Sequence, residues 1–155
     1  MSILSGSIFL QDSPNCKCSL FVRSAGCVLL LTGLAKLVSA FGTAAILNIA
    51  DPIFHMQFKH IFILAGLIEL IVGGICLVRP RRSWSLLLLA WVTTCFVLYR
   101  IGLPLSGWHR PCPCLGYFTE SLHLSQQFAD WCMKGVLMYL LLGSYYALFT
   151  SRRRV

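Results

Sequence analysis

Two cysteines separated by one proline, Cys112-Pro113-Cys114, are the residues with the clearest chemistry in this sequence. Two cysteines one residue apart can close a small strained ring, and the proline stiffens that ring by fixing one backbone angle. Strained, exposed disulfides have high reduction potentials and are typically labile or catalytic rather than structural. The pair therefore favours thiol–disulfide exchange.

The neighbours of this pair support the same chemistry but leave two alternatives open. Arg110 lies two residues before Cys112, and its positive charge would favour the thiolate that attacks another disulfide. One alternative is a permanent structural disulfide. The other is a metal site that adds His109 and His123, but the cysteine spacing differs from the usual zinc pattern of two to four intervening residues. We therefore predict a redox pair tuned by Arg110, and no metal.

Other cysteines extend the redox hypothesis. Cys132 lies at the start of the last apolar run, where we expect it as a candidate resolving thiol or as a packing residue. Cys16 and Cys18 form a second pair with one intervening residue near the N-terminus. An electron relay between the two pairs is one interpretation, although free cysteines in apolar helices are usually small packing residues.

The composition excludes most soluble protein classes. Of the 155 residues, 57% are hydrophobic and 12% are charged, and the mean hydropathy is +0.77. Soluble domains carry about 25% charged residues, so this sequence predicts an integral membrane protein in contact with the lipid bilayer. Its net charge of +8 suits anionic lipid headgroups better than nucleic acid, because the basic residues lie at the ends of apolar runs.

Four apolar runs are close to the length of about 20 residues that a helix needs to cross a bilayer. They lie at about 20–49, 61–78, 84–99 and 131–149. No alternating pattern occurs, and four strands do not close a barrel. We therefore predict an all-α integral membrane four-helix bundle, with these parts: an N-terminal tail at 1–19, a transmembrane domain at 20–150 and a basic C-terminal tail at 151–155.

The distribution of basic residues predicts the orientation of the bundle. With four spans, both termini share one side with the connection between the second and third runs. That side carries more Lys and Arg than the other, which places both termini in the cytoplasm by the positive-inside rule. The segment at about 100–130 then faces outward, into the periplasm of a bacterium, where disulfides persist.

Two opposite charges lie within apolar runs. Lys36 is near the middle of the first run and Glu69 near the middle of the second. An ionised side chain at that depth is costly, by about 2.5–3.5 kcal/mol on insertion scales. Because adjacent spans are antiparallel, the two residues fall at similar depth, and we predict a structural ion pair inside the bundle. Proton handling or contact with a quinone is the alternative for Glu69.

The order of these motifs resembles the DoxX-like superfamily, and most closely its MauE branch of methylamine utilisation proteins. The likeness rests on Gly-Leu-Ala-Lys-Leu around Lys36, on Glu69 followed by Gly73 and Gly74, and on the Cys-x-Cys-Leu-Gly segment at 112–116. It covers residues 20–150, whereas Pro113 and Leu115 depart from the common family pattern. The resemblance implies a four-helix bundle of the bacterial inner membrane that works with a periplasmic thioredoxin-like protein during maturation of methylamine dehydrogenase.

Together, the residues and the resemblance predict a redox-associated component that exchanges thiol and disulfide equivalents through Cys112 and Cys114. A non-catalytic membrane scaffold with a structural disulfide is the alternative. A quinone-binding subunit is a further alternative, since wider relatives are linked to quinone-dependent sulfur oxidation. No motif for another cofactor is present in the sequence.

Overall fold

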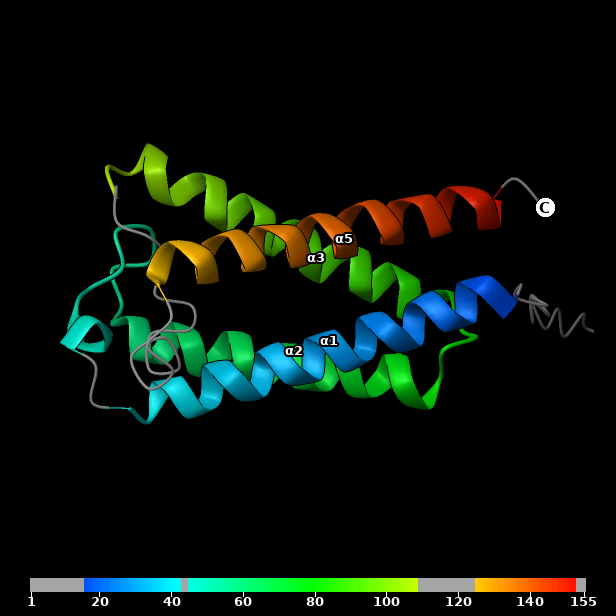
Figure 1. The fold of residues 1–155 in the computed structure, drawn as a ribbon, viewed down its shortest axis with the longest axis horizontal. Coiled ribbons are helices and arrows are strands. Elements are labelled where there is room, and N and C mark those ends of the chain that lie inside the picture. Colours follow the sequence, from blue (N-terminus) through cyan, green and yellow to red (C-terminus); the bar gives the residue numbers. More distant parts are fainter. Residues whose placement is uncertain (1–15, 43–44, 109–124, 153–155) are drawn as a thin grey trace, which may run out of the picture.

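The structure is a computed structural model that describes residues 16–42, 45–108 and 125–152. Within these ranges the chain forms long helices and no strand (Figure 1). The helices are α1 (Cys16–Ala40), the short 3-10 helix η1 (Ala45–Asn48), α2 (Phe58–Val78), α3 (Ser83–Leu105) and α5 (Gln126–Arg152).

Successive long helices run in opposite directions, with α1 packed along α2 and α3 packed along α5 (Figure 1). The bundle therefore has two distinct ends. The connection from α1 to α2, the C-terminal end of α3 and the start of α5 lie together, and we call this the Asp51 end. The start of α1, the turn between α2 and α3 and the end of α5 form the opposite end, which we call the Arg79 end.

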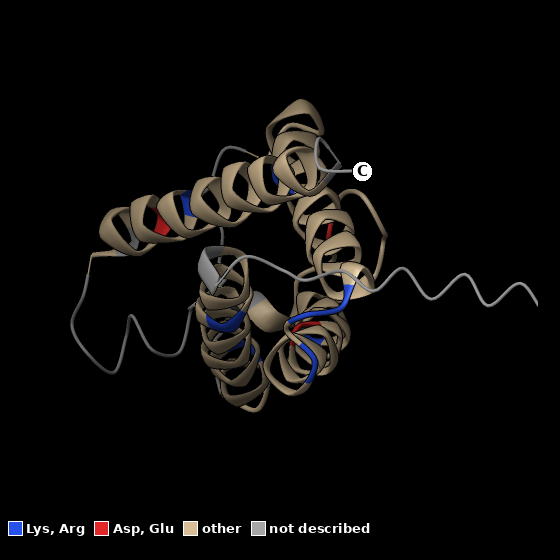
Figure 2. Ribbon diagram, turned by 90° about the vertical axis from the view of Figure 1, so that its right-hand side faces the viewer, with Lys and Arg blue, Asp and Glu red and all other residues tan. Residues whose placement is uncertain are grey.

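The outer surface of this bundle is apolar. All four long helices among the described residues are long and apolar enough to cross a membrane, and Figure 2 shows long uncharged stretches on each of them. Large side chains such as Leu31, Leu64, Trp91 and Tyr146 are exposed on the outside. Such a surface is stable against lipid tails, and it confirms the prediction of an all-α, multi-pass membrane fold.

Helix boundaries differ from the apolar runs, most of all in the first span. Helix α1 ends at Ala40 rather than near residue 49, because the amide groups of Phe41 and Gly42 donate to the carbonyls of Val38 and Ser39 in a tight turn. The helix also begins at Cys16, within the segment that the sequence assigned to the tail. A hydrophobicity pattern does not mark this turn, because the residues that follow it are also apolar.

Helix α3 extends past the third apolar run through Pro104 and ends in a glycine cap. The amide groups of Gly107 and Trp108 donate to the carbonyls of Pro104 and Leu103, respectively. Gly107 has φ +83°, a conformation that a residue without Cβ adopts without strain. This cap fixes the point at which the chain leaves α3 toward the cysteine pair.

Glycines bring α1 and α2 into close backbone contact at two levels. A Cβ atom at Gly33 would lie 3.0 Å from the carbonyl oxygen of Gly66, and a Cβ at Gly66 would lie 3.0 Å from that of Gly33. Gly26 and Gly73 repeat this reciprocal contact at the same distance. Small residues allow such approach in membranes, where dispersion contacts rather than the hydrophobic effect hold helices together. Gly74 is not part of this close contact between α1 and α2, since a Cβ atom there would meet nothing within 4 Å.

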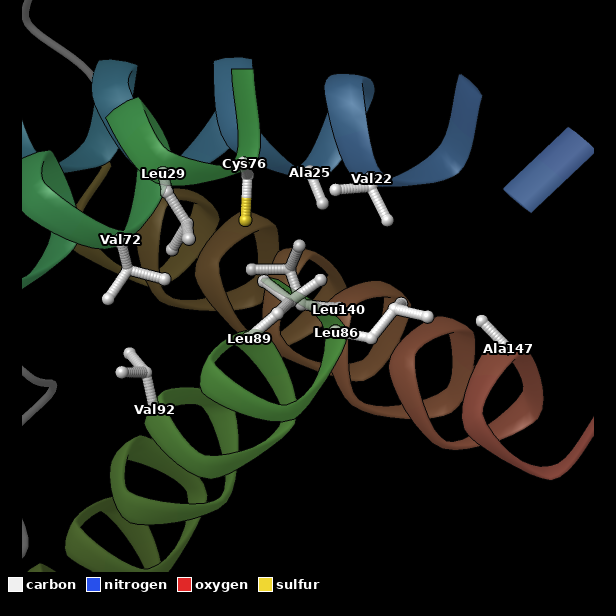
Figure 3. Close-up of a cluster of buried hydrophobic side chains, with 10 residues drawn as sticks. All are labelled: Val22, Ala25, Leu29, Val72, Cys76, Leu86, Leu89, Val92, Leu140 and Ala147. Atoms are coloured by element: carbon white, nitrogen blue, oxygen red, sulfur yellow. The ribbon is translucent and has the colours of Figure 1, made fainter. Parts of the chain in front are cut away.

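A core of aliphatic side chains joins the two helix pairs toward the Arg79 end. Figure 3 shows side chains from all four long helices pointing to a common centre around Cys76 and Leu89. A second cluster near the Asp51 end packs Phe58 and Phe62 of α2 against Ala40, Leu47 and Trp108. The bundle is thus packed at both ends, and these contacts hold the helices that carry the charged residues.

Candidate functional site

The predicted redox pair lies outside the described residues. Cys112, Cys114 and Arg110 belong to the segment 109–124, as do the alternative metal ligands His109 and His123. The structure does describe both points of attachment, the glycine cap at the end of α3 and the start of α5. Both points of attachment lie at the Asp51 end (Figure 1).

Cysteines within the helices occupy different environments. Cys132 is exposed on α5, six residues after the helix begins at the Asp51 end. Cys27 and Cys95 are also exposed, whereas Cys76 is buried in the core with its thiol 3.8 Å from the carbonyl oxygen of Ser85. The setting of Cys76 is that of a packing residue. The resolving role of Cys132 stays a prediction.

The structure brings Lys36 and Glu69 together across the α1–α2 interface. The distance between Lys36 Nζ and Glu69 Oε1 is 2.5 Å, and the two side chains are 9% and 3% exposed. Lys36 lies one turn before the end of α1, so its expected place near the middle of the first span is wrong. That expectation failed because α1 ends at Ala40, well before the apolar run does.

Helix geometry explains how these residues meet. Lys36 is three residues beyond Gly33 toward the Asp51 end, and Glu69 is three residues beyond Gly66 toward the Arg79 end. Side chains on a helix lean toward its N-terminus. In an antiparallel pair the two side chains therefore lean toward each other, and they meet beside the contact between Gly33 and Gly66.

One oxygen of this buried pair remains open. Glu69 Oε2 accepts no hydrogen bond from any described residue. The Thr32 hydroxyl lies near Glu69, but it donates to the carbonyls of Val28 and Leu29 at 3.1 and 3.2 Å. The Lys36 ammonium also lies 5.3 Å from the centre of the Phe96 ring on α3, a cation–π contact. The pair is thus held by three helices and keeps one strong acceptor unused.

A second charged cluster links α3 to α5 near the Asp51 end, and sequence reasoning missed it. Arg100 Nη1 lies 2.7 Å from Asp130 Oδ1, and Lys134 Nζ lies 2.7 Å from Asp130 Oδ2. The spacing of four between Asp130 and Lys134 was the available signal. This cluster positions the start of α5 against the end of α3, which are the two attachments of the cysteine segment.

Asp51 anchors the connection between α1 and α2. Its Oδ1 accepts hydrogen bonds from the amide groups of Ile53 and Phe54, both at 2.8 Å, and its Oδ2 accepts one from the Tyr99 hydroxyl of α3. The side chain is fully buried. The Asp-Pro pair at 51–52 signalled a turn, whereas the partner on α3 could not be read from the sequence.

A partly enclosed cavity of about 200 Å³ lies in the Asp51 half of the bundle. All four long helices contribute to its lining, which includes both members of the buried ion pair. No cluster of three metal-binding side chains occurs within 16–42, 45–108 and 125–152. The described residues thus form a mostly apolar cavity whose charged lining residues are Lys36, Glu69 and Arg100.

A four-helix membrane bundle with a buried lysine–glutamate pair and a cysteine-bearing connection at one end defines the class of this protein. The sequence model of the family described as Methylamine utilisation protein MauE matches residues 14–149. This match spans nearly all of the four long helices, so the chain belongs to the MauE family. No curated protein and no solved structure matches the chain.

Proposed function

We propose that this chain is a membrane accessory protein of methylamine utilisation that exchanges disulfides with a thioredoxin-like protein outside the cytoplasm. The observation that carries the proposal is the family match over residues 14–149, which includes the cysteine segment. The described fold supports it, because the segment 109–124 is attached at one end of a membrane bundle, where a water-soluble partner has access. Lys36 and Glu69 serve this function by holding α1 against α2.

In the proposed exchange, two thiols of this chain reduce a disulfide of the partner. The reaction also runs in the opposite direction, in which two thiols of the partner reduce a disulfide of this chain. The thiolate of Cys112 or Cys114 attacks one sulfur of the partner's disulfide, forms a mixed disulfide and releases a partner thiolate. The second cysteine attacks the mixed disulfide, so that this chain ends as a disulfide and the partner as a dithiol. Two electrons and two protons pass to the partner in this turnover. Arg110 stabilises the attacking thiolate, and Cys132 is the alternative resolving thiol.

Charge placement supports the proposed orientation in a bacterial inner membrane. The turn at the Arg79 end carries Arg79, Arg81 and Arg82, and α5 ends there in a basic tail. The opposite end has fewer basic residues, and its Arg100 and Lys134 are paired with Asp130. By the positive-inside rule the Arg79 end is cytoplasmic. The Asp51 end then faces the periplasm, where thiol exchange proteins act on disulfides.

Trapping of the mixed disulfide tests this function. We expect Cys112→Ser or Cys114→Ser to accumulate a covalent complex with another protein, visible on a non-reducing gel and lost on reduction, because the resolving thiol is gone. Cys27→Ser is the matched control, since this exposed cysteine lies on α1, and it should trap nothing. If neither variant traps a partner and the double variant still supports growth on methylamine, the scaffold alternative holds instead.

A further inference from the structure

The cavity in the Asp51 half of the bundle lies where α2 and α3 separate. The two helices diverge from their shared turn as they run toward the Asp51 end (Figure 1). Met133 and Leu137 of α5 line the cavity and are nearly buried, and its volume is about 200 Å³. Protein interiors contain few voids larger than a water molecule, so an occupant of this space would stabilise the bundle.

The polar side chains of the lining are already paired within the protein. Lys36 and Glu69 bond each other, and Glu69 Oε2 is buried away from the cavity. Arg100 pairs with a carboxylate of α5, and the Tyr99 hydroxyl donates to the buried carboxylate of the α1–α2 connection. Sites for polar small molecules use a few convergent polar groups to fix the ligand, and buried waters need such groups as well. The cavity therefore favours an occupant without polar groups.

The opening of the cavity lies on the lipid-facing surface. Leu64 on α2 and Cys95 on α3 line the cavity and are exposed on the outside of the bundle. The lining of α2 runs from Ile61 to Ile68, which is about 10 Å along the helix axis. One leaflet contributes about 15 Å to the hydrocarbon core of a bilayer, so the cavity fits within one leaflet. In a membrane, the molecules that meet this opening are phospholipids, whose acyl chains are apolar and flexible.

We infer that the cavity is a binding site for one acyl chain of a membrane phospholipid. The chain enters between α2 and α3 from the leaflet at the Asp51 end and packs against Met133 and Leu137, while its headgroup stays at the membrane surface. It fills the space that opens as α3 diverges from α2. This site does not rest on the proposed thiol exchange, since none of the lining residues belongs to the segment 109–124.

Photo-crosslinking of the purified full chain in lipid nanodiscs tests the site. The probe is a phosphatidylcholine with a diazirine midway along one acyl chain, and tandem mass spectrometry locates the adducts formed on irradiation. Bulk lipid reaches exposed side chains such as Met138, which is 53% exposed on α5. We expect a comparable yield on Met133 and Leu137, which are 8% and 9% exposed, because the chain enters the cavity.

A second buried residue of α5 controls for reaction through the protein interior. Leu140 is 2% exposed and is not part of the lining, so it should carry no adduct. Adducts that are confined to exposed side chains, or that are as frequent on Leu140 as on Leu137, would overturn the assignment. This comparison needs no variant and so does not depend on how a substitution folds.

Variants of α2 separate the cavity from the outer surface. Ala65→Phe places a ring in the cavity and should lower the adducts on Met133 at least about tenfold relative to those on Met138, because the ring takes the space of the chain. Leu67→Phe is the matched control, since Leu67 lies on the same helix, is exposed and is not part of the lining; its adducts should match those of the unchanged protein. Circular dichroism checks that both variants are folded. Unchanged adducts on Met133 in folded Ala65→Phe would overturn the proposal.

Native mass spectrometry identifies the occupant. We expect the unchanged protein released from the nanodiscs to retain one phosphatidylcholine and Ala65→Phe to retain none. Retention of a different lipid-soluble molecule from the expression host in its place would overturn the choice of an acyl chain. Cys112→Ser and Cys114→Ser should keep the adducts on Met133, so a failure of this site and a failure of the thiol exchange remain distinguishable.

Discussion

At the scale of single residues, the Lys36–Glu69 pair places two charged groups in the apolar interior of the bundle. Each charge leaves water to enter an apolar environment, and the cost is offset only while the partner remains at 2.5 Å. The pair recovers part of this cost through the cation–π contact with Phe96. Removing one partner should therefore harm the protein more than removing both.

We expect Lys36→Met and Glu69→Leu each to lower the free energy of unfolding by about 3 kcal/mol, because each leaves an uncompensated buried charge. The double variant should lose less than either single variant. SDS titration of the detergent-solubilised protein, followed by circular dichroism, measures these values. Lys134→Met is the control, since Lys134 is 53% exposed and Asp130 keeps Arg100; it should cost about 1 kcal/mol or less. Equal losses in all three pair variants would contradict the pairing.

At the scale of helices, the glycine contacts between α1 and α2 set how closely the two backbones approach. We expect Gly66→Ala to destabilise the protein by about 1–3 kcal/mol, because the new methyl group meets a backbone oxygen that cannot move independently of α1. Gly74→Ala, on the same helix but facing open space, should change stability by about 0.5 kcal/mol or less. The same SDS titration compares them, and similar losses would rule out the close-approach interface.

Sequence patterns predicted the number and type of these helices but not their rotation about their own axes. In a soluble helix, polar residues mark the outer face. Here the lipid-facing Leu64 and the core residue Leu89 are equally apolar, since lipid tails and the protein interior resemble each other as solvents. Long-range partners depend on that rotation, which is why the contacts of Asp130 with Arg100 and of Asp51 with Tyr99 were missed. The Lys36–Glu69 contact could be anticipated because opposite charges in neighbouring spans have few other partners.

At the scale of the whole molecule, the two ends of the bundle differ in chemistry. The Arg79 end carries the basic turn, whereas the Asp51 end combines an anchored connection, a charged cluster and both attachments of the cysteine segment. The cavity lies in the same half. The basic turn at the Arg79 end supports our proposal that the Asp51 end faces the oxidising side of the membrane and that thiol exchange takes place there.

Cysteine labelling from outside the cell tests this central claim most directly. The protein would be expressed in a bacterium with every other cysteine except the buried Cys76 replaced by serine. The replaced cysteines are Cys16, Cys18, Cys27, Cys95 and Cys132. We predict that a membrane-impermeant maleimide added to intact spheroplasts labels Cys112 and Cys114 only after a reductant is added, because the pair is an oxidised disulfide outside the cytoplasm. Labelling that requires lysis of the spheroplasts, with or without reductant, would contradict the account.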